Sequence, residues 1–103
     1  MKQEKSCGCI IIDNQKILLI YVKDDDGNIF WGFPKGHQEE GETDFETAIR
    51  ETKEETNLDV EIIDEKPIMA NHIINNSTIN KQILLFISRL TTKNQQIKIK
   101  KAK

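Results

Sequence analysis

The sequence lacks a long apolar run, a net positive charge and more than two cysteines. No apolar stretch of its 103 residues approaches the length that spans a bilayer, and the formal net charge is −2. A chain with this charge has no overall positive field to attract nucleic acid or anionic membranes. We therefore expect a cytoplasmic protein with neither a membrane nor a nucleic-acid partner, which must hold any anionic substrate through local groups.

The two cysteines, Cys7 and Cys9, lie two residues apart in an alternating apolar segment. On a strand they would share one face with parallel side chains, which is poor geometry for a disulfide. No further cysteine is available to complete a Cys-x-Cys metal site. We expect two free, partly buried thiols.

The length and the 37% apolar content suit one small domain, residues 1–103, with a single core. Apolar, β-branched runs between turn formers predict strands, and the pattern as a whole predicts an α+β fold with a mixed β-sheet. Residues 13–15 and 75–77 are predicted turns, residues 32–41 an irregular segment, and residues 91–103 a solvated tail in which 97–100 could instead form an edge strand. The predicted strands are Cys7–Ile12, Lys16–Val22, Ile29–Trp31, Leu58–Ile63, Ile68–Ile74 and Ile79–Leu90.

One segment, Thr43–Asn57, predicts a helix. Thr43 is a suitable N-cap, and Glu46 three residues later would complete a capping box. Asn57 can take the left-handed conformation that ends a helix. Spacing at about 100° per residue places an apolar stripe on one side of this helix, which we expect to pack on the sheet. The stripe consists of Phe45, Ala48, Ile49 and Thr52.

Three glutamates on the same helix, Glu51, Glu54 and Glu55, are spaced so that they project from one face. They repel one another unless a cation compensates their charge, and oxygen ligands at this density favour Mg²⁺. An acidic helix face is more often simply solvated. Gly36 and Gly41 in the preceding loop let the backbone approach a ligand closely, which favours a binding site.

Loop and helix together resemble the Nudix box, the signature of the Nudix hydrolases. The box occupies residues 36–58, and the positions that agree with it are Gly36, Glu42, Arg50, Glu51, Glu54, Glu55 and Leu58. Two positions depart from it. Thr52 stands where the box has an aliphatic residue, which puts a hydroxyl against the core, and Asn57 replaces the helix-ending glycine.

The segment from Trp31 to His37 and the segment from Cys7 to Ile10 are similar to the asymmetrical diadenosine tetraphosphate hydrolases. The resemblance implies a mixed sheet with the box helix packed on it and Mg²⁺- or Mn²⁺-dependent hydrolysis of a pyrophosphate linkage, with a dinucleoside polyphosphate or a nucleoside triphosphate as substrate. It also implies that the metal is held by Gly36, Glu51, Glu54 and Glu55. The expected catalytic residues are Glu54, Glu51 and Arg50, and the expected phosphate contacts are Lys35 and His37.

Several alternatives stay open. Arg50 would orient the carboxylates through Glu42 or Glu46, or form only an ordinary helical pair with Glu46. Trp31, Phe33 and Phe86 would belong to the core more often than they would stack a base, and His72 has no special role. Other functions with the same box are a catalytically weak nucleotide-binding or partner-binding module and an RNA-end pyrophosphohydrolase. Family members continue beyond the strand that ends at Leu90, so we expect a domain truncated at its C-terminus, without its last helix, that forms a homo-oligomer.

Overall fold

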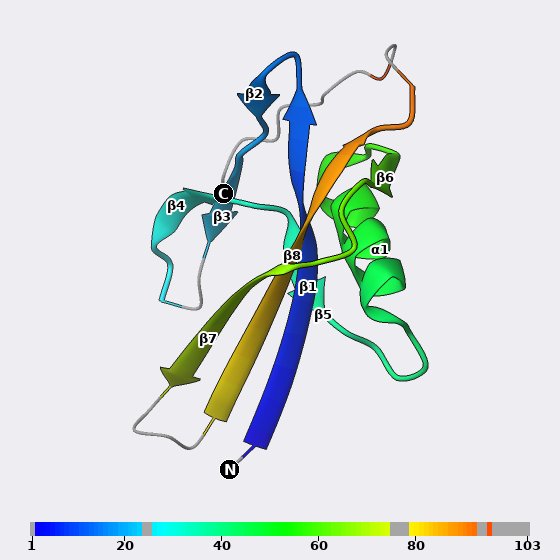
Figure 1. The fold of residues 1–103 in the computed structure, drawn as a ribbon. Coiled ribbons are helices and arrows are strands. Elements are labelled where there is room, and N and C mark those ends of the chain that lie inside the picture. Colours follow the sequence, from blue (N-terminus) through cyan, green and yellow to red (C-terminus); the bar gives the residue numbers. More distant parts are fainter. Residues whose placement is uncertain (1, 24–25, 75–78, 93–94, 96–103) are drawn as a thin grey trace.

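The computed structural model describes residues 2–23, 26–74, 79–92 and 95, and within them the chain forms eight strands and one helix (Figure 1). The predicted turn at 75–77 and the predicted edge strand at 97–100 lie outside the described residues. The elements are β1 (Lys2–Asp13), β2 (Lys16–Ile17), β3 (Ile20–Lys23), β4 (Ile29–Gly32), β5 (Lys35–His37), α1 (Asp44–Thr56), β6 (Val60–Ile62), β7 (Ile68–Ile74) and β8 (Ile79–Leu90).

A mixed six-stranded sheet forms the centre of the fold, as predicted. Its middle consists of β1 and β8, which run parallel with Cys7 opposite Leu84 and Cys9 opposite Phe86. The outer edge of β1 pairs antiparallel with β2 and β5, and the outer edge of β8 pairs antiparallel with β6 and β7. The strands β3 and β4 form a separate two-stranded sheet to one side (Figure 1).

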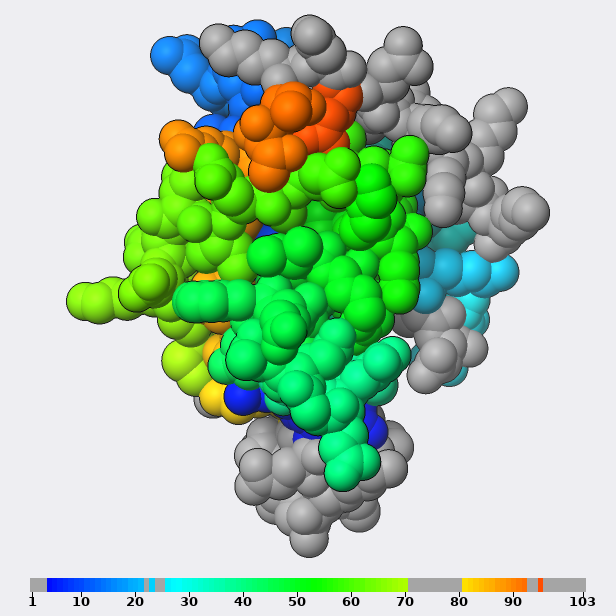
Figure 2. All heavy atoms as spheres, turned by 90° about the vertical axis from the view of Figure 1, so that its right-hand side faces the viewer, coloured from blue at the N-terminus to red at the C-terminus, as the bar shows by residue number. Residues whose placement is uncertain are grey.

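The helix α1 covers one face of the six-stranded sheet, and both of its predicted ends are confirmed. The hydroxyl of Thr43 accepts from the Glu46 amide at 3.1 Å, and the Glu46 carboxylate accepts from the Thr43 amide at 2.9 Å. Asn57 adopts the left-handed conformation with φ 62° and ψ 18°. Figure 2 shows that α1 and the loop before it occupy the middle of this face of the molecule.

The core lies between α1 and the sheet. Because side chains alternate along a strand, one face of β1 sends every second residue toward the helix. Both cysteines lie on that face, free and fully buried, and burial is the main cause that raises the pKa of the Cys7 thiol to about 11. The buried core residues are Cys7, Cys9, Ile11, Ala48, Leu58, Val60, Leu84 and Phe86.

The buried stripe of α1 differs from the predicted one. Ala48 and Thr52 are fully buried, but Phe45 and Ile49 are 37% and 38% exposed. Phe45 still meets the core at its edge, with its ring 4.9 Å from that of Phe86. The buried side of α1 is rotated toward Thr47 and Thr56. The helix also contacts β5, where Glu51 lies against Gly36. The spacing of apolar residues could not predict this contact, because it is made by a charged side chain.

The predicted strands need further corrections. β1 begins at Lys2, well before the predicted start at Cys7, and β6 covers only Val60–Ile62 of the predicted Leu58–Ile63. The segment predicted as one strand over Lys16–Val22 is interrupted at residues 18 and 19, which separate β2 from β3. The segment 32–41 was predicted to be irregular throughout, yet it contains β5, which pairs with residues 6–8 of β1. That pairing is long-range, and its strand of three residues is too short to show periodicity. The one helix is too short and too polar to cross a membrane, and no other helix occurs among the described residues.

Candidate active site

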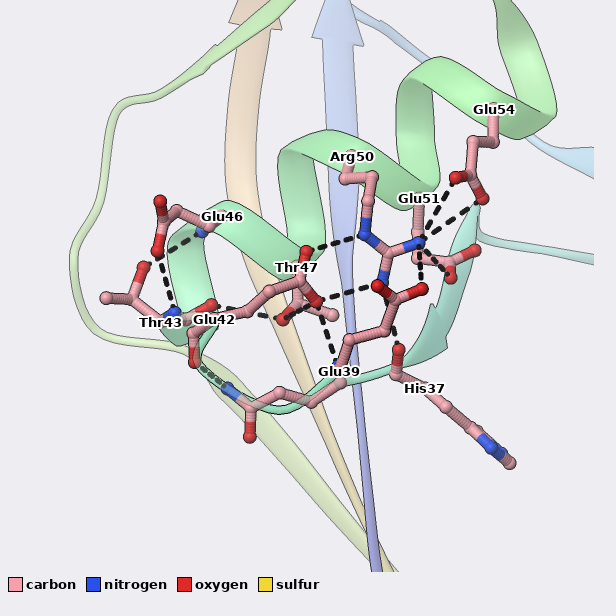
Figure 3. Close-up of polar contacts among 10 residues, drawn as sticks. His37, Glu39, Glu42, Thr43, Glu46, Thr47, Arg50, Glu51 and Glu54 are labelled. Carbon is pink, nitrogen blue, oxygen red and sulfur yellow. Dashed lines mark hydrogen bonds and ion pairs between the residues drawn. The ribbon is translucent and has the colours of Figure 1, made fainter.

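Arg50 is the centre of the polar network that joins the loop to the helix (Figure 3). Its Nε donates to Glu42 Oε2 at 2.6 Å and its Nη2 donates to Glu42 Oε1 at 2.9 Å, a bidentate pair. The same Nη2 donates to the His37 carbonyl oxygen at 3.1 Å. Of the two partners considered from the sequence, the structure therefore selects Glu42, because the Glu46 carboxylate is engaged in the capping box.

Glu42 receives two further hydrogen bonds, from the Thr47 hydroxyl at 3.0 Å and from the Glu39 amide at 2.9 Å. Donors aimed at a carboxylate favour its charged form. The hydrogen bond from Arg50 is the largest cause that lowers the pKa of Glu42 to about 2, and the Glu39 amide adds to it. Glu42 is thus a permanently charged anchor for the loop at neutral pH.

The remaining nitrogen of Arg50 contacts the other acidic groups. Nη1 donates to Glu51 Oε2 at 2.9 Å and to Glu54 Oε1 at 3.2 Å. The two carboxylates differ in exposure, since the side chain of Glu51 is 15% exposed and that of Glu54 is 58% exposed. Arg50 therefore ties Glu42, Glu51 and Glu54 to one guanidinium group, and the hydrogen bond with Glu42 is the main cause that raises its pKa.

Glu51 lies directly against the backbone of β5. A Cβ placed on Gly36 would stand 2.1 Å from Glu51 Cδ and 2.2 Å from its Oε1, closer than any side chain tolerates. Only glycine leaves room for the carboxylate here. The absence of a side chain at position 36 thus lets the Glu51 carboxylate lie beside the backbone of β5. Carboxylate and backbone carbonyl oxygens are the ligands that suit a hard cation.

Glu55 reaches the same strand one residue earlier. Its Oε1 accepts a hydrogen bond from the backbone amide of Lys35 at 2.8 Å. Burial is the main cause that raises the pKa of Glu55, opposed by this hydrogen bond. The amide contact could not be read from the sequence, because it depends on β5 lying beside α1.

Lys35 and His37, the expected phosphate contacts, both lie on β5. Lys35 is half-buried, and its pKa is lowered mainly by burial and then by the nearby charge of Lys81. His37 is exposed, with its Nε2 3.6 Å from Glu4 Oε2. Both residues occupy alternate positions of one short strand, so they share a face of the sheet.

The backbone of every site residue expected from the sequence lies at the junction of β5, the loop and α1. The side chains of Lys35 and His37 alternate with Gly36, whose Cβ position faces Glu51, so they project from the face of β5 opposite α1. The three glutamates have different partners. Glu51 lies against Gly36 and accepts a hydrogen bond from Arg50, and Glu54 accepts from Arg50 alone. Glu55 accepts from the Lys35 amide. Across the described part of the chain, no three His, Cys, Asp or Glu side chains gather at metal-binding spacing. The oxygen-rich donor set at this junction nevertheless fits a hard divalent ion.

Comparison with known families identifies the fold. The family model of the NUDIX domain matches residues 2–98. The chain belongs to the Nudix family. The resemblance found in the box is thereby confirmed, and it extends over nearly the whole chain.

The curated relatives of this Nudix chain include asymmetrical bis(5'-nucleosyl)-tetraphosphatases. The mouse protein is 41% identical over 63 residues, which are 53% of this chain and 43% of the relative. The pig protein is 40% identical over the same shares. The matched region is thus less than half the length of these relatives.

Solved structures agree on the fold. A NUDIX hydrolase from Nitrosomonas europaea superposes with a TM-score of 0.76 at 20% identity, covering 96% of this chain and 66% of that one. The Ap4A hydrolase of C. elegans superposes with a TM-score of 0.72 at 24% identity, covering 97% of this chain and 76% of that one. The predicted fold class, a mixed sheet with the box helix packed on it, is confirmed.

Proposed function

We propose that this chain carries a Mg²⁺- or Mn²⁺-dependent pyrophosphohydrolase site that acts on a nucleoside diphosphate derivative, best of all a dinucleoside polyphosphate such as diadenosine tetraphosphate. The observation that carries the proposal is the contact between Gly36 and Glu51, with Glu55 bonded to the next residue of the same strand. This arrangement holds the carboxylates of Glu51 and Glu55 against the backbone of β5. The two negative charges repel each other, and a bound divalent cation would relieve that repulsion.

The residues that would hold the metal are Gly36 through its carbonyl, Glu51, Glu54 and Glu55. A bound Mg²⁺ supplies charge neutralisation at the phosphoryl oxygens and a fixed position for water. Arg50 orients Glu51 and Glu54, and Glu42 holds Arg50 in place through the bidentate pair. Arg50 is therefore assigned a positioning role, because its donors are already used by carboxylates and by the His37 carbonyl.

Glu54 is the carboxylate best placed to accept a proton. It is the most exposed of the three, and among the described residues its carboxylate accepts hydrogen bonds from Arg50 alone. In the proposed step a water oxygen forms a bond to phosphorus, the bond from that phosphorus to the bridging oxygen breaks, and Glu54 takes the proton of the water. The bridging oxygen leaves with the second phosphate. Lys35 and His37 lie on β5 beside Gly36 and would contact the remaining phosphates.

The substrate class rests on the family and on the relatives. Three of the curated relatives, from mouse, rat and pig, are named asymmetrical bis(5'-nucleosyl)-tetraphosphatases, and each is 40–41% identical to this chain over 63 residues. The net charge of −2 leaves phosphate binding to local cations, which suits a small nucleotide better than a long polyanion.

Hydrolysis of a substrate panel tests the proposal. Phosphorus NMR would follow diadenosine tetraphosphate, nucleoside triphosphates, ADP-ribose and capped RNA with Mg²⁺ and with a chelator. We expect metal-dependent cleavage, with Glu54→Gln slower by about a hundredfold or more. Glu61→Gln is the matched control, because Glu61 lies on β6 and pairs with Arg89 instead. Equal rates with chelator, or equal rates in Glu54→Gln and wild type, would contradict the assignment.

Metal binding can be measured without turnover. Because a ligand that binds only the folded state raises its stability, Mg²⁺ should raise the melting temperature of the wild type. Glu55→Gln keeps an oxygen that accepts from the Lys35 amide but removes a charge from the cluster. We expect this variant to melt no lower than wild type without metal and to lose most of the Mg²⁺-induced rise. A full rise in the variant would remove Glu55 from the site.

A further inference from the structure

The β3–β4 hairpin exposes an unusual amount of apolar surface. It forms a two-stranded sheet of its own and lies to one side of the six-stranded sheet (Figure 1). Large apolar side chains exposed together on one face of an element mark a binding surface more often than ordinary surface. Tyr21, Ile29 and Trp31 lie on one face of the hairpin and are 48%, 49% and 57% exposed, whereas Phe30, 45% exposed, lies on the opposite face.

Two of these side chains are already arranged as a stack. Tyr21 and Trp31 are direct cross-strand partners, with ring centroids 3.9 Å apart and an interplanar angle of 25°. Such a pair stabilises a hairpin. It does not bury itself, however, because Tyr21 remains 48% exposed and Trp31 remains 57% exposed. Trp31 was expected in the core, and the structure places it at the surface. We call this pair the aromatic stack.

The aromatic stack is joined to the candidate active site by a short piece of chain. Trp31 precedes Lys35 by four residues, so their Cα atoms are at most about 14 Å apart even if the link is fully extended. The amide of Lys35 is bonded to Glu55, and Pro34 is held to β1 by the bond from the Cys9 amide to its carbonyl at 3.1 Å. The distance from the aromatic stack to Glu55 and its neighbouring glutamates is thus comparable with the length of an extended nucleoside triphosphate.

We propose that the aromatic stack formed by Tyr21 and Trp31 receives a purine base of the substrate, and so selects nucleotides over other polyphosphates. The inference rests on the proposed function for the position of the phosphates. A base is the occupant that fits, because a flat ring can extend an existing stack on its free face while the attached phosphates reach Lys35. No specific base readout is needed, since every base has a π face.

Trp31 provides a direct reporter, because it is the only tryptophan of the chain. Its fluorescence would be followed during titration with a methylene-bridged ATP analogue, which is not cleaved, and with inorganic tripolyphosphate, which has no base. We expect saturable quenching by the analogue and little change with tripolyphosphate. Quenching of equal size by both ligands would overturn the proposal, because it would mean that phosphate alone perturbs the ring.

A pair of variants separates stacking from general loss of apolar surface. Tyr21→Ala should weaken binding of the analogue about tenfold while leaving tripolyphosphate binding unchanged, as measured by calorimetry. Phe30→Ala is the matched control, because Phe30 is 45% exposed in the same hairpin but points to its opposite face. Circular dichroism and melting would show that both variants fold. Equal weakening in both variants, or none in Tyr21→Ala, contradicts the proposal.

Failure of this proposal can be told from failure of the proposed function. If wild type hydrolyses nucleotides but Tyr21→Ala has unchanged KM, the aromatic stack is wrong and the function stands. The opposite outcome is also possible: no substrate of the panel is hydrolysed, but the analogue quenches Trp31 and Tyr21→Ala weakens its binding. In that case the base-binding proposal holds and the proposed function is wrong. If Trp31 emission instead depends on protein concentration without nucleotide, the surface binds a second copy and the proposal is overturned.

Discussion

The carboxylate of Glu51 lies against Gly36 so closely that a Cβ at position 36 would stand 2.1 Å from Glu51 Cδ. This contact joins the strand β5 to the helix α1 at the point where the box begins. A side chain at position 36 is incompatible with the site, because it would displace Glu51, one of the expected metal ligands.

Gly36→Ala should therefore displace Glu51 and lower the affinity for Mg²⁺ by about tenfold or more, measured by calorimetry. Gly41→Ala is the informative comparison. Gly41 has a φ of +87°, which strains any other residue, but a Cβ there meets nothing within 4 Å. That variant should melt lower and still bind Mg²⁺ normally. A Gly36→Ala protein with unchanged affinity would show that the contact is not needed for the metal site.

The pairing of Glu42 with Arg50 predicts an acid-dependent stability. The folded state lowers the pKa of Glu42 from 4.5 to about 2, so the charged pair contributes fully above pH 4.5 and its contribution is lost as the pH falls toward 2. Between these values wild type should lose more stability than Glu42→Gln, which cannot titrate. Urea unfolding at a series of pH values would measure this. Parallel pH curves for the two proteins would contradict the assigned pairing.

Thr52 carries a buried hydroxyl without a hydrogen-bond partner among the described residues, and its side chain is fully buried. Thr52→Val keeps the shape and removes the unpaired group, so we expect a gain of about 1 kcal/mol in the free energy of unfolding. Thr56→Val is the matched control, because the Thr56 hydroxyl donates to the Thr52 carbonyl at 2.6 Å and accepts from the Leu58 amide at 3.1 Å. That variant should lose stability. Denaturant titration measures both, and a loss in Thr52→Val would refute the account.

The end of α1 offers a fourth test. Asn57 occupies the left-handed region at a cost that glycine does not incur. Asn57→Gly should stabilise the protein by a few tenths of a kcal/mol up to about 1 kcal/mol, and Asn57→Ala should destabilise it. Thermal melting of the two variants would show the difference. Activity should not change in either variant, because Asn57 contacts none of the carboxylates of the site. Equal melting of both would mean that the backbone relaxes at this position.

Several features followed from the sequence because they depend on neighbours in the chain. The capping box of Thr43 and Glu46 and the left-handed Asn57 are local interactions, completed within a few residues. The long strands β7 and β8 match their predicted bounds because their alternating or continuous apolar runs are long enough to show a pattern. The box itself could be recognised because its spacing is a property of the chain.

Only the tertiary structure decided which partner each charged group takes. The choice of Glu42 over Glu46 by Arg50, and of the Lys35 amide by Glu55, depends on how the loop folds back on α1. The buried side of α1 and the exposure of Trp31 were likewise mispredicted from the sequence, since both depend on where β5 and the β3–β4 hairpin lie. Spacing along a chain determines which side chains share a face, whereas their partners come from segments whose positions are determined only when the sheet assembles.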